Sequence, residues 1–596
     1  MTSIPFAILA PYRLSPLIKT VIEMNNKVAD VIYFNGYIYT ADQQDSVVDA
    51  IAVQDGYIIA SGTSEALHQY VGPETESIDL EGKMMMPGII DGHMHPFWGG
   101  IQLFGCHLNY ESLTIDQILQ RVQDHLDKDP RTGENDWLKV TAWLRQGMLP
   151  AGIDMYREDM DKLKTNRPVV LFSNDCHTLL ANSRALELFG ITKETPEPPD
   201  GKIGKYDNGE LNGILEDAPA MRAADSIPSI RDDQAVEVAE LVQKVLNQQG
   251  VTTVMDARVS EQQLEAFAEL QRRDELTLRF QAAREITPDD TPNVAAVAAA
   301  VDKAVAFAKK WHQADWTPKP GIGLRNIKMF VDGVLQYPTM TASLLQPYRI
   351  NQGTDSAPNW VETDNYGDLY FTAEILNELM EKIAAAGYDP HLHTVGEGAV
   401  SIVLDAIEKM RAAHPEKDIR PGLAHNELVH PKDYERFARL KTIACLSFQW
   451  AAPTPELAAF ECNMLGEERF EQLEPIAKFI DAGAVVAFGS DWPIDDFDEW
   501  YDLKVAATRR GRDINGQPAP RLDNDRDLTV IEVLRSATID SAFAQHREDV
   551  IGSLEAGKFA DMIVLDRNVF EIPADDIENV KVLRTIIGGK TVHIAS

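Results

Sequence analysis

The sequence predicts an α/β protein built on a (β/α)8 (TIM) barrel, with a small β-sandwich domain formed by both ends of the chain. Three observations lead to this fold. Eight short apolar strands alternate with helical segments through the middle of the chain, strand and turn patterns occur near both ends, and polar residues recur where the eight strands finish. With 596 residues, 44% of them hydrophobic, the chain can bury a barrel and a further domain.

Residues 28–86 are expected to form the first part of the sandwich, after an N-terminal extension over residues 1–27. Short strands flank two strong turn signals, with residues 30–34 and 37–40 around Asn35-Gly36, and residues 51–54 and 57–61 around Asp55-Gly56. We expect each pair to be a β-hairpin.

Residues 548–596 show the same pattern of short strands and turn signals and are expected to complete the sandwich. Residues 559–565 are strand-like, and residues 582–587 meet residues 591–594 across Gly588-Gly589. Two β-rich ends around a different middle predict one small domain made from both.

The barrel is assigned to residues 87–547. Its expected strands are residues 88–91, 251–256, 278–281, 327–331, 390–393, 422–425, 443–448 and 485–488. Helical patterns cover residues 234–247, 294–311, 373–385 and 531–542, and Thr529 with Glu532 forms a capping box for the last. The long gap after the first strand predicts an inserted subdomain at about residues 100–230.

The amino-acid composition favours some classes of binding partner over others. A net charge of −37 disfavours nucleic acids and anionic membranes. Four cysteines without a C-x-x-C pair suit reduced thiols and a cytoplasmic location. No apolar run approaches the roughly 20 residues that span a bilayer. We therefore expect a soluble protein that acts on a small molecule, and base rates favour a homodimer.

Polar residues at the strand ends are the candidates for chemistry, because a barrel directs them into its mouth. They are His93, His95, Lys328, His393, His425 and Asp491. His93 and His95 are two apart on an extended segment, so both imidazoles can reach one ion such as zinc. A carboxylate such as Asp491 can bind metal or exchange a proton with water.

Several of these positions leave alternatives open. His393 is favoured over His391 as a ligand, and His391 is expected to be packed or hydrogen-bonded inside the barrel. His425 alone is compatible with a core imidazole, and Asp491 with a turn. A buried Lys328 is costly unless it is modified, for example carboxylated to bridge two metals, or paired with a carboxylate such as Asp332.

Residues 86–95 closely resemble the first-strand signature of the amidohydrolase superfamily, and residues 552–561 resemble the signature with which its chain returns to the β-sandwich. The internal segments are similar to the third amidohydrolase group (amidohydrolase family 3), whose best-known activity is deformylation of N-substituted formamides. They are residues 175–177 with Asn182 and Ser183, residues 328–333, 393–396 and 489–491.

The resemblance implies hydrolysis of a non-peptide C–N bond, in an amide or formamide-like small molecule, with one or two divalent ions of the Zn²⁺ type. By position it makes ligands of the four histidines and Asp491, with Asp491 also the acid/base and Lys328 an N6-carboxylysine ligand. The substrate-binding residues expected are His177, Asn182, Asp332, Gln449, Trp450 and Trp492. Phe97 and Trp98 could add to an aromatic pocket.

The chain departs from the family pattern at Glu397, at residues 334–338 and at Gln449-Trp450, which puts the substrate rather than the metal chemistry in question. A deaminase is the nearest rival, but its usual Glu three residues after the fifth-strand histidine is Gly396 here. A non-catalytic binding or regulatory protein on the same fold is the rival from another class.

Overall fold

The computed structural model describes residues 28–595, except 110, 130, 146–147, 151–152, 174–177, 197–200, 228–229, 231, 338–339, 355–356, 454 and 513–517. The expected N-terminal extension, residues 1–27, lies outside the described residues. The chain divides into two compact units, one from residues 1–96 with 243–596 and one from Phe97–Val242. Each is described by itself.

Eight parallel strands of the first unit form one sheet in which spatial order follows chain order. They are β8 (Ile89–Met94), β15 (Val251–Asp256), β16 (Arg279–Glu285), β17 (Ile322–Phe330), β20 (Asp389–Thr394), β21 (Gly422–His425), β22 (Ile443–Leu446) and β23 (Val485–Phe488). The backbone N–H of Asp491, just past β23, donates to the carbonyl of His93 in β8, so the barrel is nearly closed. All eight predicted strands are confirmed.

Helices separate the strands, as a parallel sheet requires. They include α8 (Asp232–Gln248), α9 (Glu261–Arg272), α10 (Val294–Trp311), α11 (Ala373–Ala386), α12 (Glu397–Ala413), α13 (Tyr434–Leu440), α14 (Pro455–Leu465), α16 (Ile476–Asp481) and α17 (Glu499–Thr508). The predicted helix over residues 531–542 is wrong as a single element. It is two helices, α18 (Val530–Ser536) and α19 (Ile539–Ala544), because Thr538 leaves the helical region at φ −134° and ψ −94°. The capping box of Thr529 and Glu532 is confirmed.

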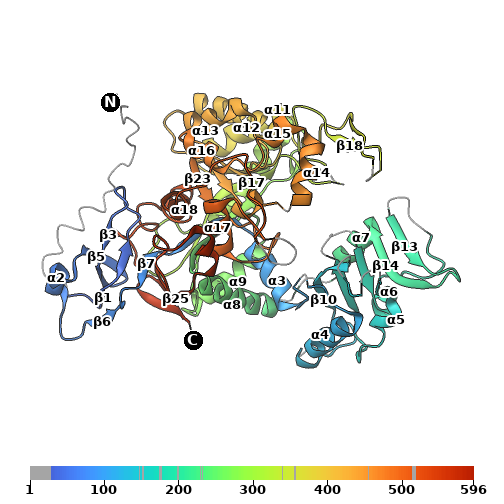
Figure 1. The fold of residues 1–596 in the computed structure, drawn as a ribbon, viewed down its shortest axis with the longest axis horizontal. Helices are drawn as coiled ribbons and strands as arrows, with labels where there is room; N and C mark the ends of the chain where they lie inside the picture. The colour runs from blue at the N-terminus through green and yellow to red at the C-terminus, as the bar shows by residue number, and fades with distance from the viewer. Residues whose placement is uncertain are drawn as a thin grey trace. The chain divides into compact units, whose positions relative to one another are not determined.

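Both chain ends meet in a six-stranded sheet, in which the N-terminal (blue) and C-terminal (red) strands adjoin (Figure 1). Its order is β26 (Lys590–Ile594), β25 (Val582–Ile587), β24 (Met562–Leu565), β7 (Met84–Pro87), β2 (Tyr37–Tyr39) and β3 (Val47–Val48). A four-stranded sheet has the order β5 (Tyr57–Gly62), β4 (Ala50–Gln54), β1 (Val31–Phe34) and β6 (Glu76–Asp79). Side chains of both sheets share one hydrophobic cluster, which includes Tyr33, Ile51, Met85 and Met562.

The turn signals in this region have different outcomes. The hairpins across Asp55-Gly56 and Gly588-Gly589 are confirmed by antiparallel pairing of β4 with β5 and of β25 with β26. The hairpin across Asn35-Gly36 is wrong, because β1 pairs with β4 and β6 while β2 pairs with β3 and β7. Asn35 does turn the chain, with φ 56°, but it carries the chain from one sheet into the other.

The second unit has its own six-stranded sheet, in the order β13 (Gly201–Lys205), β14 (Leu211–Asp217), β12 (Thr178–Ala181), β11 (Val169–Ser173), β10 (Leu138–Trp143) and β9 (Cys106–His107). Helices α4 (Ile115–Lys128), α5 (Arg157–Met160), α6 (Ser183–Leu188) and α7 (Ala218–Ser226) belong to the same unit. Within the described part of the chain, no helix has the length and apolarity needed to cross a membrane.

Candidate metal centre

Three strand ends bring polar side chains together at the mouth of the barrel. Asp491 Oδ1 lies 3.4 Å from His93 Nε2 and 3.4 Å from His95 Nε2, and its Oδ2 lies 3.8 Å from His425 Nδ1. Ligand atoms of His93, His425 and Asp491 all lie within 4.8 Å of one another. Strands β8, β21 and β23 therefore contribute to one centre although they are far apart in the sequence.

The backbone around Asp491 is shaped for this approach. Asp491 itself has a left-handed φ of 57°. A Cβ on Gly489 would lie 2.6 Å from the Cβ of His93, so only glycine lets the two segments come so close. Ser490 then donates its N–H (3.1 Å) and its hydroxyl (2.5 Å) to Asp91 Oδ2, which fixes the segment against β8.

The donor atoms at this centre suit a divalent cation. Among the described residues, His93 Nε2, His425 Nδ1 and Asp491 Oδ1 are buried without a hydrogen-bond partner. Burial lowers the pKa of His93 and His425 well below its usual value, so both imidazoles are neutral and able to bind metal. Burial raises the pKa of Asp491, because its negative charge lacks compensation that a cation would supply. The residues present thus fit a metal ion.

Two groups orient these histidines from behind. His391 is hydrogen-bonded inside the barrel, as expected, with its Nε2 2.7 Å from His93 Nδ1. Asp256, the last residue of β15, has Oδ1 4.0 Å from His95 Nδ1. The sequence reasoning missed Asp256, although a carboxylate at the end of a barrel strand was the available signal. Burial raises the pKa of Asp256 to about 8.

His393 lies beside the centre rather than within the closest group. Its ring centroid is 4.5 Å from that of His425, but its Nε2 lies 2.9 Å from the carbonyl oxygen of Gly333. For His393 Nε2 to bind a metal, its contact with the Gly333 carbonyl oxygen would have to be replaced by the bond to the metal.

Lys328 is fully buried on β17, and its Nζ has no hydrogen-bond partner among the described residues. The ammonium lies 4.6 Å from the centroid of the Phe330 ring. Burial lowers its pKa, an effect that the nearby Asp491 partly offsets. The expected alternative of an ion pair with Asp332 is wrong, because Asp332 instead accepts the backbone N–H groups of Ser343, Val395 and Gly396 at 2.8–3.0 Å.

The family assignment follows from comparison with known proteins. The family model described as "Amidohydrolase family" matches residues 76–593. The chain belongs to the amidohydrolase family. It is similar to the N-substituted formamide deformylase of Arthrobacter pascens, with 26% identity over 587 residues, covering 94% of this chain and 98% of the relative. It is also similar to protein LONG AFTER FAR-RED 3 of Arabidopsis thaliana, with 25% identity over 584 residues, covering 95% and 92%.

Among solved structures, an uncharacterized metal-dependent hydrolase from Pyrococcus horikoshii OT3 resembles this amidohydrolase with a TM-score of 0.69 and 23% identity. The likeness covers 91% of this chain and 99% of that one. At this identity the comparison shows a shared fold.

Three residues expected to contact substrate in this amidohydrolase, Gln449, Trp450 and Trp492, each contact a residue at or next to the candidate metal centre. The Trp450 ring is stacked against the ring of His425 at 5.4 Å, and its Nε1 donates to Asp495 Oδ2 at 2.6 Å. Gln449 Nε2 donates to the carbonyl of Ser490 at 2.6 Å. Trp492 is buried, and its ring lies 5.1 Å from that of Phe497. Trp450 is therefore an aromatic side chain in direct contact with His425 of the candidate metal centre.

The position of the usual deaminase glutamate is Gly396 here, and the nearest acid is the next residue, Glu397. In the structure Glu397 opens α12 and its Oε1 accepts the backbone N–H of Leu345 at 3.2 Å. The carboxyl group holds a loop in place, which disfavours a proton-transfer role.

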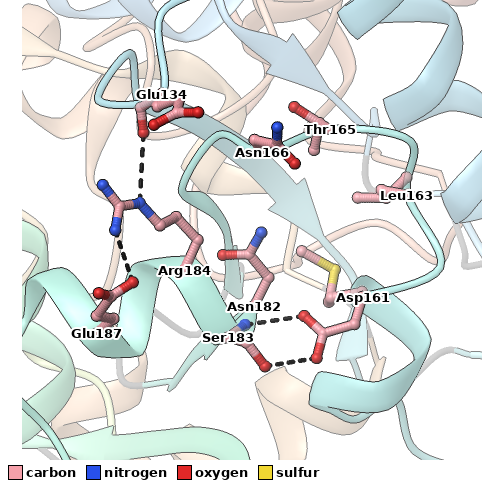
Figure 2. Close-up of a pocket in the computed structure, with 10 residues that line it drawn as sticks. Glu134, Asp161, Leu163, Thr165, Asn166, Asn182, Ser183, Arg184 and Glu187 are labelled. Carbon is pink, nitrogen blue, oxygen red and sulfur yellow. Dashed lines mark hydrogen bonds and ion pairs between the residues drawn. The ribbon is translucent and has the colours of Figure 1, made fainter.

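The remaining expected residues belong to the Phe97–Val242 unit. His177 lies outside the described residues. Asn182 caps α6, with Oδ1 accepting from Ala185 and Val169 and Nδ2 donating to Arg167. It also lines a pocket of about 420 Å³ within this unit (Figure 2).

Proposed function

We propose that this amidohydrolase hydrolyses a non-peptide C–N bond in an amide or N-substituted formamide-like small molecule at a divalent metal centre. The observation that carries the proposal is the group of buried, unpartnered donor atoms of His93, His425 and Asp491 within 4.8 Å. A cation is the ligand that satisfies two neutral imidazoles and a buried carboxylate together.

His93, His95, His425 and Asp491 would hold the ion, which we take to be zinc because nitrogen and oxygen donors suit it. When bound, the metal supplies Lewis acidity toward a carbonyl oxygen and acidifies water. His391 and Asp256 keep the rings of His93 and His95 turned toward the centre, through the contacts at 2.7 and 4.0 Å.

Asp491 is proposed as the proton carrier. Its carboxylate accepts a proton from the attacking water and donates it to the departing nitrogen, so that amide and water give acid and amine. Its position supports this role, because Asp491 Oδ1 lies 3.4 Å from both His93 Nε2 and His95 Nε2 and therefore beside the candidate metal centre.

Lys328 is proposed to be carboxylated and to bridge two ions, with His393 as a further ligand. The step adds CO2 to a neutral amine and releases one proton. Burial supports it, because the lowered pKa increases the neutral fraction of an amine that has no hydrogen-bond partner among the described residues. Trp450 beside His425 favours a substrate with an aryl or alkyl substituent on nitrogen.

Metal content decides the proposal. Protein purified without chelator is analysed by mass spectrometry, as wild type and as Lys328→Ala, and then screened with formamides, amides and cyclic ureas. About two ions per chain, falling in the variant, support the bridged centre. About one ion, unchanged by the substitution, retains the hydrolase and removes the bridging lysine. No metal after reconstitution with zinc would contradict the enzymatic proposal.

A further inference from the structure

A small cavity lies inside the barrel, behind His93. It has a volume of about 20 Å³, and its walls come from six barrel strands and the end of α19. Lining residues include Gly92, Met255, Asn326, His391, Gly422 and Gln545. A single water needs roughly 10–15 Å³ of such space, so the cavity fits one water molecule.

The polar groups around the cavity suit a water. Gln545 is 5% exposed, and both its amide oxygen and its amide nitrogen are buried without a partner among the described residues. Leaving such an amide unpaired costs about 1–3 kcal/mol. The Arg420 guanidinium also lines the cavity, but it is engaged by Asp418, Glu548 and the carbonyl of Phe543.

His391 connects this cavity to the metal centre. Its Nε2 contacts His93 Nδ1 at 2.7 Å, and its Nδ1 lies near Gly422. A Cβ at Gly422 would lie 2.9 Å from that Nδ1, a non-bonded contact shorter than real Cβ atoms make. Glycine at this position therefore leaves space beside the second nitrogen of His391.

The direction of the His391–His93 hydrogen bond decides whether His93 can bind metal. A neutral imidazole carries one proton, on either nitrogen. If His391 Nε2 carries the proton and donates to His93 Nδ1, the remaining proton of His93 sits on Nε2 and blocks metal binding. In the reverse polarity His93 Nδ1 donates to His391 Nε2, and His391 Nδ1–H must find an acceptor of its own.

We propose that one internal water occupies the cavity, accepts from His391 Nδ1–H and donates to Gln545 Oε1, so that this chain holds His93 with its Nε2 lone pair toward the metal. Gln545 and His391 are then positioning residues, acting on the metal centre through His93. This inference rests on the proposed metal-binding role of His93.

The test replaces Gln545 with Met, which keeps the length of the side chain and removes both polar atoms. Zinc affinity is measured by competition with a chromophoric chelator, and the thermal midpoint of the metal-free protein is measured in parallel. We expect Gln545→Met to weaken zinc binding 10- to 100-fold, the range for loss of an outer-shell partner. Gln545→Glu, which keeps an acceptor oxygen, should stay within a few-fold of wild type.

Met255→Leu is the matched control, because Met255 lines the same cavity without a strong polar group. It should leave zinc affinity unchanged. Affinity of Gln545→Met within twofold of wild type overturns the inference, as does an equal loss in Met255→Leu. A crystal structure of the wild type should show water within hydrogen-bond distance of His391 Nδ1 and Gln545 Oε1, and a dry cavity there also overturns it. If the wild type binds no zinc while the water is present, the failure is that of the proposed function.

Discussion

The mouth of the barrel and the pocket of the Phe97–Val242 unit are both lined by polar side chains, but these differ in whether they are paired. In the pocket Ser183 donates to Asp161 and Arg184 pairs with Glu187 (Figure 2). At the mouth, His93 Nε2, His425 Nδ1 and Asp491 Oδ1 lie close together and have no hydrogen-bond partner among the described residues. Unsatisfied buried polar atoms that converge on one point, as at the mouth, call for a ligand, whereas the paired atoms of the pocket are accounted for by local structure.

Two aspartates, one in each region, show the same contrast. At the mouth, burial raises the pKa of Asp256 to about 8. In the Phe97–Val242 unit, burial acts in the same direction on Asp129, but hydrogen bonds and charge from Arg131, with charge from Arg167, hold its pKa at about 2. Burial therefore dominates the pKa of Asp256, whereas two arginines dominate the pKa of Asp129.

The largest effect should follow substitution of Asp491, the proposed proton carrier. Asp491→Asn should lower kcat by about 10²–10⁴-fold, the usual range for a general acid or base. Steady-state kinetics measure it, once a substrate is found. Thermal stability of the metal-free variant should not fall, because a buried unpaired carboxylate is removed. A kcat within a few-fold of wild type would withdraw the proton-transfer role.

Metal should stabilise the protein through the mouth alone. Zinc at 100 times its Kd stabilises the native state by about 2.7 kcal/mol. We expect a rise in thermal midpoint for the wild type, none for His425→Ala, and an unchanged rise for Asn182→Ala. Differential scanning calorimetry with and without zinc provides the comparison. An equal rise in His425→Ala would place the metal elsewhere.

The pH dependence of metal-free stability should have opposite signs in the two regions. Because the folded pKa of Asp256 is raised, its contribution is fully present below the unfolded pKa of about 3.9 and is lost as pH rises toward 8. Asp256→Asn should therefore flatten a decline in stability between about pH 5 and 8. Urea unfolding across this range tests it, and an unchanged slope would contradict the assignment.

For Asp129 the folded pKa is lowered, so its contribution is present above the unfolded pKa and is lost as pH falls from about 4 to about 2. Because solvent partly screens these ion pairs, we expect a shift of this size to contribute about 1 kcal/mol. Asp129→Asn should lose that amount at neutral pH while leaving zinc affinity intact. A drop in zinc affinity with no change in unfolding free energy is the contrary result.

The smallest effect is expected from substitution of Asn182. The result distinguishes a role as helix cap from a role as substrate contact. As a helix cap it should cost about 1 kcal/mol when replaced by Ala. Its side chain is fully engaged by backbone groups, so kcat/KM should change less than twofold. A loss of 100-fold or more in kcat/KM with normal stability would instead support the substrate contact predicted from sequence.

Local patterns predicted much of this fold because parallel barrel strands are buried on both faces and read as short apolar runs. The Asn35-Gly36 hairpin failed because a turn signal does not specify which strands pair after the turn, and both edges of β1 are taken by β4 and β6. Thr538 divides a helical pattern by leaving the helical region of φ and ψ, which residue spacing alone does not indicate.

The site was predictable where position in a strand decided it, as at His93, His95, His425 and Asp491. The pairing of Asp332 with Lys328 was a wrong prediction. The carboxylate oxygens of Asp332 accept backbone N–H groups of residues 343, 395 and 396, which come together only when the loops fold. Asp256 was overlooked because a single aspartate at a strand end resembles an ordinary turn residue.

The pairing of β7 with β24 joins Met84–Pro87 to Met562–Leu565, and β8, which carries His93 of the candidate metal centre, follows β7 directly. During synthesis, nearly 500 further residues therefore have to be added after β7 before its partner β24 leaves the ribosome. A nascent chain will carry an unpaired strand edge next to its first barrel strand for that whole interval, at the usual rate of 5–20 residues per second for about half a minute or more. An unpaired strand edge is prone to aggregation, so we expect this interval to be a vulnerable stage in the folding of the chain.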